Sequence, residues 1–446
     1  MYASGTEGSE LMKQLDVSIE INGRQREVGV ISGNNDYDAS FCYSEHYLES
    51  GTARPISISL PLTDKPYGPE PTRRFFEGLL PEGFMRRTVA EQNRTDDGDY
   101  LSILEMLGAE CLGAVQIKGE NYKNIEPSYK AFDPDTMYKL AAEGATRSAD
   151  LVVEAHLSLT GASGKIGAYK NTDGRWFLPV GSAPSTHILK QSHIRYDKIV
   201  QNEQLALKTA ELLGIDVPKS EIVEAYPEPV HDTGLNPPVT ENVLFATRRY
   251  DRTFEGAADY IDGMLCPLRL HQEDLGQALG IPASGKYERP GEHHMKKMFD
   301  LLRRYSASPI EDQMKLWDII VFHWLIGNTD GHIKNFSLVY DANLKAIRLA
   351  PAYDIVSTIL YDTHSSEMAF SVGGQIEWSR IDRTCFEDAC KECGLNKKMF
   401  MSRLDEKKAL FRDALMRAAE TVHDEGFEEA VRMAGKILEV SNVTAK

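Results

Sequence analysis

The sequence predicts an α+β fold in which a mixed N-lobe is followed by a helical C-lobe and preceded by a further α+β subdomain. Strand-like runs crowd the section from about residue 155 to residue 250, and helical patterns dominate from residue 272 to the end. A polar stretch containing prolines, at residues 126–135, predicts a linker after an earlier unit. We therefore expect a disordered tail at 1–13, an N-terminal subdomain at 14–135, the N-lobe at 136–250 and the C-lobe at 251–446.

The composition is that of an acidic globular protein. The 446 residues carry 50 basic and 67 acidic side chains, a net charge of −17, so we expect no binding of nucleic acid through the average surface. We find neither a secretory signal nor an apolar run of about 18 residues, which predicts a cytoplasmic chain without a membrane span. The six scattered cysteines indicate reduced thiols, and CKEC at 390–393, which has no second CxxC, is interpreted as ordinary helix cysteines rather than a redox or zinc site.

The first unit is predicted to open with a β-hairpin. Apolar residues alternate in VSIEI and REVGV across residues 17–30, and Asn22-Gly23 between them favours a tight turn. Helical patterns follow in FFEGLLPEGFMRRTVAEQ and YLSILEMLG, and GAVQIKG at residues 113–119 indicates a closing strand.

A loop of small residues follows the strand expected at LVVEAHLSL, residues 151–159. The run SLTGASGK occupies residues 158–165 and precedes the strand pattern IGAYKN. Glycines allow a close approach of the backbone, and successive N–H groups can cradle an anion. The run lacks the spacing and the final Ser or Thr of a Walker A loop, so a plain hairpin turn is the alternative.

Lys190 ends the strand-like run STHILK, and Glu203 lies thirteen residues further on in the amphipathic pattern NEQLALKTAELLG. A strand lysine held by a helix glutamate is the usual device for binding α- and β-phosphates in kinases. The alternatives are an exposed lysine at a strand end and a first-turn acid favoured by the helix dipole. The run VLFATRRYDR at 243–252 predicts the last N-lobe strand and a hinge whose backbone would face adenine.

The most informative segment is GNTDGHIKNFSLVYDANLKAIRLAPAYD, residues 327–354. Asp330 and Asn335 have the spacing D-x4-N, two short strands are expected after them, and Asp354 follows nineteen residues beyond Asn335. In phosphoryl transfer one Asp orients the attacking hydroxyl, while an Asn and a second Asp hold magnesium. Chance spacing and simple turn chemistry at DGH are the alternatives. The apolar helix expected at 315–328 favours a kinase C-lobe, because helix, loop, hairpin and Asp follow in the right order.

Taken together, these segments resemble the HipA family of bacterial Ser/Thr kinases, the toxins of type II toxin–antitoxin systems. The resemblance covers almost the whole chain and keeps order and spacing. Its segments are RPISISLPL, FFEGLLPEG, LGAECLGAVQI, SLTGASGK, STHILK with NEQ, RRYDR, LHQEDLGQALGIP, IGNTDGHIKNFS and PAYDIVST. It implies a bilobal protein-kinase-like fold with an additional N-terminal subdomain.

The resemblance also implies roles for the matching residues. Asp330 would be the catalytic Asp, and Asn335 and Asp354 would hold Mg²⁺. Lys190 would bind the α- and β-phosphates of ATP, and Lys165 would approach the γ-phosphate. The other residues implied at the ATP site are Thr160, Gly161, Ala162, Ser163 and Gly164 in the loop, Arg248, Arg249 and Tyr250 at the hinge, and His332 and Tyr353 beside the nucleotide.

Regulation is implied at Ser158, the serine just before the glycine-rich loop. In the family this serine is autophosphorylated, which ejects the loop and switches the enzyme off; a strand-end serine without a special role is the alternative. The chain departs from the family at Ser163 and Gly164, where a Gln and an acidic or polar residue are usual, and at Arg248, a position that is often acidic. These departures bear on loop contacts, autoinhibition and nucleotide preference.

The predicted function is that of an ATP- and Mg²⁺-dependent Ser/Thr protein kinase acting as a HipA-like toxin. The resemblance implies an aminoacyl-tRNA synthetase as the phosphorylated target, so that translation stalls. It also implies a HipB-like helix-turn-helix antitoxin that makes most of the DNA contact. One alternative is a small-molecule kinase of the aminoglycoside or choline type, although those enzymes lack a matching N-terminal unit. The other is a mainly non-catalytic co-repressor partner, against which the presence of Asp330, Asn335 and Asp354 argues.

Overall fold

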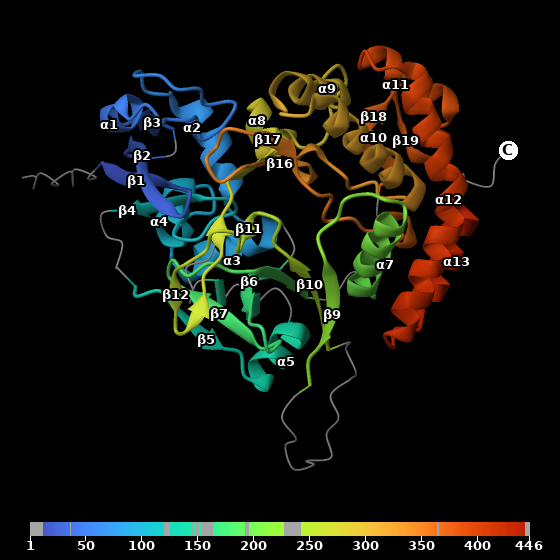
Figure 1. The fold of residues 1–446 in the computed structure, drawn as a ribbon, viewed down its shortest axis with the longest axis horizontal. Coiled ribbons are helices and arrows are strands. Elements are labelled where there is room, and N and C mark those ends of the chain that lie inside the picture. The colour runs from blue at the N-terminus through green and yellow to red at the C-terminus, as the bar shows by residue number, and fades with distance from the viewer. Residues whose placement is uncertain are drawn as a thin grey trace, which may run out of the picture.

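The computed structural model describes residues 12–35, 37–119, 125–143, 147–148, 151–152, 164–191, 196–226, 242–363 and 365–441. The fold is α+β, as predicted, with the two larger sheets built from the first 250 residues and the longest described helices after them (Figure 1). The tail expected at 1–13 lies outside the described residues except for Met12 and Lys13, and Lys13 already begins a strand. None of the helices in the described part is long and apolar enough to cross a membrane.

The N-terminal unit is built on an antiparallel sheet of strand order β3-β2-β1-β4. Its strands are β1 Lys13–Ile21, β2 Arg24–Gly33, β3 Ser40–Tyr43 and β4 Val115–Gly119. The predicted hairpin is confirmed: Asn22 and Gly23 both have a positive φ, 49° and 73°, which is the conformation that matches the twist of the paired strands.

Four helices accompany this sheet: α1 Glu45–Glu49, α2 Pro69–Phe76, α3 Gly83–Gln92 and α4 Tyr100–Leu107. The helical pattern expected across residues 75–92 is interrupted by the short 3₁₀ turn η1 Glu77–Leu79 and by extended backbone at Leu80. Pro81 follows Leu80, and the residue before a proline is pushed away from helical dihedrals. The FFEGLLPEG segment, residues 75–83, therefore runs from the last residues of α2 to the first residue of α3, and we call it the strap.

The second sheet has six strands in the order β5-β7-β6-β8-β10-β9. They are β5 Ser128–Ala131, β6 Lys165–Lys170, β7 Trp176–Val180, β8 His187–Gln191, β9 Ser220–Glu224 and β10 Val243–Arg248. Helices α5 Pro134–Glu143 and α7 Ile199–Leu212 accompany it. The segment expected as a linker thus contains a sheet strand, because β5 pairs along its length with β7. Leu151 and Val152 are helical rather than extended, and the rest of the strand expected at 151–159 lies outside the described residues.

The C-terminal part carries a small sheet of order β15-β16-β17, with β15 Gln272–Asp274, β16 Ser337–Tyr340 and β17 Ile347–Leu349. The hairpin predicted after Asn335 is confirmed by the antiparallel pairing of β16 and β17. The helices are α8 Leu275–Leu279, α9 His294–Tyr305, α10 Pro309–Ile326, α11 Arg383–Glu392, α12 Lys397–Asp424 and α13 Glu429–Val440. Figure 1 shows α12 and α13 along the edge opposite the N-terminal unit.

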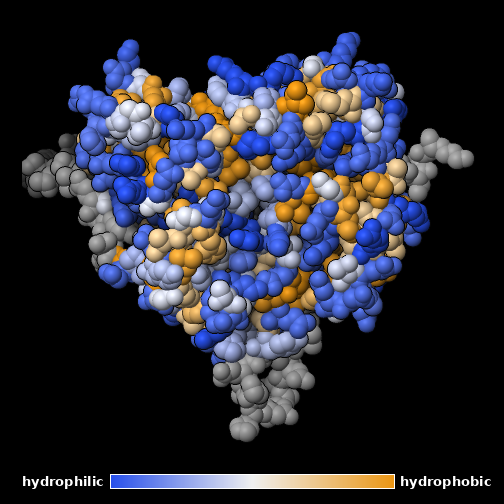
Figure 2. Space-filling model, viewed as in Figure 1, coloured by the Kyte–Doolittle hydropathy of each residue, from blue (hydrophilic) through white to orange (hydrophobic). Residues whose placement is uncertain are grey.

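Short strand pairs complete the topology. They are β11 Arg252–Thr253 with β14 Leu268–Arg269, β12 Tyr260–Ile261 with β13 Met264–Leu265, and β18 Glu367–Val372 with β19 Gln375–Glu377. Hydrophilic residues cover most of the face seen in Figure 2, and apolar residues lie between them in small groups.

Helix α10 is the buried support of the C-lobe. Pro309 occupies its first turn, where a missing N–H costs nothing, and thirteen of its residues are buried. Gly327 ends the helix in the left-handed region at φ 70°, and a Cβ there would lie 2.4 Å from the Ile359 side chain. Glycine is thus required at this position by both conformation and space. The chain leaves α10 directly into the segment that holds Asp330.

A buried charge network joins the N-terminal unit to the rest of the molecule. Glu110, in the segment LGAECLGAVQI, receives hydrogen bonds from Arg252 at 2.7 Å and from Arg269 at 2.6 and 2.8 Å. Asp251 accepts from Arg249 at 2.6 and 2.8 Å, and Glu20 lies 3.2 Å from Arg269. Three arginines thus face three carboxylates in a site closed to solvent, so removal of one partner would leave a buried charge uncompensated.

We expect Glu110→Gln to lower the free energy of unfolding by about 3–5 kcal/mol, the range for breaking a buried ion pair. The matched control is Glu70→Gln, which removes an exposed partner of Arg74 and should cost below about 1 kcal/mol. Denaturant unfolding of both variants measures the difference. Equal, small losses in the two variants would contradict the structural role of this network.

Candidate active site

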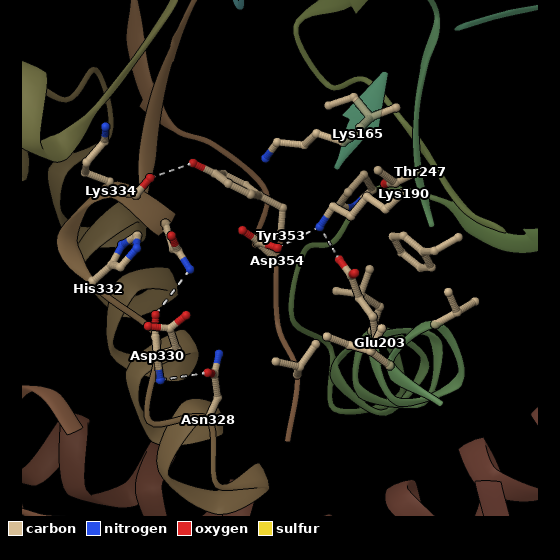
Figure 3. Close-up of a pocket in the computed structure, with 18 of the residues that line it drawn as sticks. Lys165, Lys190, Glu203, Thr247, Asn328, Asp330, His332, Lys334, Tyr353 and Asp354 are labelled. Atoms are coloured by element: carbon tan, nitrogen blue, oxygen red, sulfur yellow. Dashed lines mark hydrogen bonds and ion pairs between the residues drawn. The ribbon is translucent and has the colours of Figure 1, made fainter. Parts of the chain in front are cut away.

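Lys190 lies at the centre of the candidate site. Its Nζ is 2.6 Å from Oε1 of Glu203 on α7 and 2.6 Å from Oδ1 of Asp354 (Figure 3). Burial opposes the charge on Lys190, but the two carboxylates outweigh it and raise the pKa of the lysine above its ordinary value. The structure therefore brings together the lysine, the glutamate and the aspartate that the sequence singled out. Since α7 begins at Ile199, Glu203 lies beyond the first turn, and the dipole alternative does not apply.

A second lysine faces the same space. Lys165 and Lys190 are directly opposite each other on the antiparallel strands β6 and β8. Like charges directly opposite on a sheet repel each other, and burial beside Lys190 lowers the pKa of Lys165, although Asp354 acts in the opposite direction. Figure 3 shows both lysine side chains directed towards Asp354. Two ammonium groups held in this way form a site suited to a polyanion.

Strand periodicity fixes the apolar part of the same face. Ile188 on β8, with Phe245 and Thr247 on β10, shares the sheet face of the two lysines, because side chains alternate along each strand. Together with α7 and the C-lobe loops they line a cavity of about 390 Å³. The cavity is apolar beside Phe245 and Ile188 and charged beside Lys190 and Asp354, an arrangement typical of small-ligand sites.

Asp354 is held in an unusual backbone conformation. Its φ is 57°, in the left-handed region that non-glycine residues seldom adopt. Burial alone would raise the pKa of the Asp354 carboxyl, but Lys190 and Lys165 outweigh that effect and hold the pKa well below its ordinary value. The following segment is fixed by Asn202 of α7, which bonds the backbone N–H of Ser357 at 2.8 Å and its carbonyl at 3.0 Å.

The loop that carries Asp330 is packed tightly against α10. The side chain of Asn328 accepts a hydrogen bond from the Asp330 N–H at 3.1 Å, and Asn335 Nδ2 donates to the Asp330 carbonyl at 3.4 Å. A Cβ on Gly331 would lie 1.9 Å from Nδ1 of His323, so only glycine fits in this turn. Asp330 and Asn335 thereby face the same cavity as Asp354.

The Asp330 carboxylate already has a hydroxyl partner. The hydroxyl of Tyr287 donates to Asp330 Oδ1 at 2.6 Å, although the tyrosine as a whole is 47% exposed. Hydrogen bonding of this kind is the contact that an acceptor hydroxyl makes with a catalytic base. The Tyr287 hydroxyl thus occupies one oxygen of the Asp330 carboxylate.

Two aromatic groups expected beside the nucleotide also line the cavity. Tyr353 stacks on Tyr250 with ring centroids 5.6 Å apart, and its hydroxyl is 2.6 Å from Oγ of Ser337. Burial lowers the pKa of His332 to about 4, so its imidazole is neutral at pH 7. Nδ1 of His332 is buried without a hydrogen-bond partner in the described part of the chain, a state that a bound polar ligand would relieve.

The hinge residues Arg248, Arg249 and Tyr250 all border the cavity, but they differ in role. Arg248 is exposed. The guanidinium of Arg249 points into the buried charge network and donates to Asp251, so only the main chain of this residue is free to face the cavity. Its backbone N–H already bonds the carbonyl of Thr186 at 2.9 Å. The side chain of Arg249 thus has a structural role, and the place of this residue at the nucleotide stays a prediction.

Part of the predicted site lies outside the described residues. This applies to Ser158 and to the loop residues Thr160, Gly161, Ala162 and Ser163. Gly164 is described and leads directly into Lys165 at the start of β6. The proposed autophosphorylation and the loop contacts therefore stay predictions.

Asn335 and Asp354 fit a magnesium ion by the chemistry of their donors. No group of three His, Cys, Asp or Glu side chains with metal-binding geometry occurs among the described residues. Magnesium needs no such group, because it is bound through one or two side-chain oxygens, substrate phosphates and water. Lys190 occupies only Oδ1 of Asp354, and the second oxygen has no hydrogen-bond partner within the described ranges.

The structure adds residues to the site that the motif analysis did not identify: Glu82, Lys286, Tyr287, Asn328 and Lys334, all of which but Tyr287 line the cavity. Lys334 lies within D-x4-N, and Glu82 lies within the FFEGLLPEG segment. These positions were visible in the sequence, but their convergence depends on how the N-terminal unit docks, which no local pattern encodes.

Family comparisons agree with this architecture. The HipA N-terminal domain matches residues 19–118, and the HipA-like C-terminal domain matches residues 157–418. Y4mE of Sinorhizobium fredii, a candidate kinase by its name, is 31% identical over 90% of this chain and 91% of its own. The serine/threonine-protein kinase toxin HipA of Shewanella oneidensis is 24% identical over 81% of this chain and 80% of its own.

A solved structure shows the same fold. The Shewanella oneidensis HipA, in a complex with HipB and operator DNA, superimposes with a TM-score of 0.74 at 19% identity and covers 96% of both chains. The fold thus defines a bilobal, kinase-like protein with an additional N-terminal unit. This chain belongs to the HipA family.

We expect Lys165→Met to weaken binding of ATP by roughly 10- to 150-fold, since a hydrogen bond to a charged group contributes about 1.5–3 kcal/mol. The same change should raise the midpoint of thermal unfolding of the nucleotide-free protein, because it removes a buried charge opposite Lys190. Titration calorimetry and thermal unfolding measure the two effects.

Lys170→Met is the control, because Lys170 lies on the same strand and pairs with Glu221 outside the cavity. ATP affinity should be unchanged in this variant. Unaltered ATP affinity in Lys165→Met would remove Lys165 from the anion site.

Proposed function

We propose that this chain is an ATP- and Mg²⁺-dependent serine/threonine protein kinase of the toxin–antitoxin type. The observation that carries the proposal is the convergence of Asp330, Asn335, Asp354 and the Lys190–Glu203 pair on one cavity. These groups come from two lobes and from distant segments, so chance spacing of a short motif does not account for their meeting. Phosphoryl transfer needs positioning and charge stabilisation more than covalent chemistry, and these groups supply both.

Each side chain has a distinct task in this proposal. Lys190 and Lys165 hold the phosphates, and Glu203 keeps Lys190 in place. Asn335 and Asp354 would hold magnesium, which would supply positive charge to stabilise the negative charge that develops on the transferred phosphoryl group. Asp330 accepts the proton of the acceptor hydroxyl, at the oxygen where Tyr287 now donates.

The acceptor is proposed to be a protein, with an aminoacyl-tRNA synthetase as the target class implied by the family resemblance. The proposed partner is a HipB-like antitoxin, because the solved HipA relative is in a complex with HipB and operator DNA. A net charge of −17 favours an antitoxin, rather than this chain, as the main DNA contact. Operator binding by this chain alone, as strong as with an antitoxin, would contradict that assignment.

We expect Asp330→Asn to lower the rate of phosphoryl transfer by about 10²- to 10⁴-fold, the usual contribution of a general base. Tyr287→Phe removes the hydroxyl that contacts the same oxygen and should retain transfer, because Tyr287 moves no proton. The measurement is phosphate incorporation into protein by mass spectrometry after incubation with Mg²⁺ and ATP.

Wild-type rates in Asp330→Asn would place the catalytic base elsewhere. Incorporation of phosphate into an aminoglycoside or choline, with none into protein, would assign the site to a small-molecule kinase instead. Absence of transfer to any acceptor by the wild-type chain would contradict the proposed activity.

A further inference from the structure

The segment FFEGLLPEG, which the catalytic assignment does not use, is seated directly on the C-lobe. The carbonyl of Phe75 accepts a hydrogen bond from Gln277 Nε2 at 2.9 Å. A Cβ on Gly78 would lie 2.8 Å from Cγ of the same glutamine, so the glycine allows the strap to approach α8. Gln277 is itself fixed by a capping box with Asp274 at the start of α8. The strap therefore packs closely against α8 at Gln277, through a hydrogen bond and a close approach at Gly78.

At the end of this strap, Glu82 reaches the catalytic loop. Its carboxylate is 2.5 Å from Nζ of Lys334 and 3.0 Å from Nζ of Lys286. The side chains are 18%, 8% and 21% exposed, respectively, so these pairs are screened by water less than a surface ion pair. Burial opposes ionisation of Glu82, but both lysines outweigh it and lower its pKa to about 2. The carboxylate is therefore charged at neutral pH.

Each of the two lysines is adjacent in the chain to a residue of the candidate site. Lys334 directly precedes Asn335, the expected magnesium ligand, and Figure 3 shows its amino group directed away from Lys190 and Asp354. Lys286 directly precedes Tyr287, whose hydroxyl bonds Asp330. One carboxylate from the N-terminal unit thus contacts the chain neighbour of Asn335 and the chain neighbour of Tyr287. Without Glu82, both ammonium groups would lose this close carboxylate, and Lys334 would keep a longer contact of 3.9 Å with Asp274.

We propose that Glu82 is a positioning residue for phosphoryl transfer, and that the N-terminal subdomain completes the active site by fixing the catalytic loop through Lys334 and Lys286. This inference rests on the proposed kinase function. Its basis is the two short contacts of Glu82, the tight seat of the strap and the adjacency of both lysines to site residues. The N-terminal subdomain is thereby part of the catalytic apparatus.

The test compares Glu82→Gln with Glu77→Gln. Glu77 lies in the same strap, is 17% exposed and pairs with Arg73 and Arg86 at 2.9 Å within the N-terminal unit. We expect Glu82→Gln to lower kcat by about 10- to 100-fold, as small displacements of reacting groups do, and to raise the Mg²⁺ concentration needed for half-maximal rate. ATP affinity should change little, because Lys165 and Lys190 are not displaced. Glu77→Gln should keep the wild-type kcat and Mg²⁺ dependence.

A double-mutant cycle assigns the route. If Glu82 acts through Lys334 and Lys286, the loss of kcat in Glu82→Gln/Lys334→Met should be smaller than the sum of the two single losses, because the two variants break the same ion pair. The double variant also removes both buried charges, so the comparison stays valid if Glu82→Gln folds poorly. Additive losses, or the same loss of kcat in Glu77→Gln, would overturn the proposal.

Amide hydrogen exchange of the peptide covering residues 328–336 gives a readout independent of activity. We expect faster exchange in Glu82→Gln than in wild type or Glu77→Gln, because the loop loses its anchor. If the wild-type chain transfers no phosphate, the proposed function fails, and this exchange measurement still decides whether Glu82 fixes the loop. Unchanged exchange in Glu82→Gln would overturn the positioning role.

Discussion

The ion pairs of Lys190 are the constraint on which the site depends. This single ammonium group joins strand β8, helix α7 through Glu203, and the C-lobe segment through Asp354. A buried ammonium is stable only with such partners, so sheet, helix and C-lobe must meet where they do. The same requirement leaves Lys165 facing Lys190 across two strands. The cavity thus holds the ammonium groups of Lys165 and Lys190 beside the carboxylates of Glu203 and Asp354, which supports the proposed binding of phosphates together with a divalent cation.

The N-terminal unit is held to this centre by two different devices. The buried network around Glu110 and three arginines joins it to the hinge region, and there the role is structural. The Glu82 contact, in contrast, reaches the loop that carries Asp330. Arg249 borders the cavity, and its guanidinium belongs to the first network. The network therefore fixes the position of the hinge strand end. The position of the N-terminal unit and the geometry of the site are therefore coupled through two sets of ion pairs, one around Glu110 and one at Glu82.

The sequence predicted most of what local patterns encode. The hairpin at Asn22-Gly23, the helix ending at Gly327 and the D-x4-N loop each follow from turn chemistry or spacing. The sequence could not predict that β5 joins the second sheet, because pairing between distant strands leaves no local signal. For the same reason the contacts of the Arg249 side chain could not be predicted: this residue borders the cavity, while its guanidinium belongs to a buried network. Glu82 was missed although its segment was noted.

The most direct test of the account is the Mg²⁺ dependence of nucleotide binding, measured by titration calorimetry with a non-hydrolysable ATP analogue. The wild-type chain is predicted to bind one equivalent, more tightly with Mg²⁺ than with EDTA. Asp354→Asn should bind equally in both conditions, because the variant lacks the carboxylate that would hold the metal. Equal binding by the wild-type chain with and without Mg²⁺, or an unchanged Mg²⁺ dependence in Asp354→Asn, would contradict the assignment of this cavity as a Mg²⁺–ATP site.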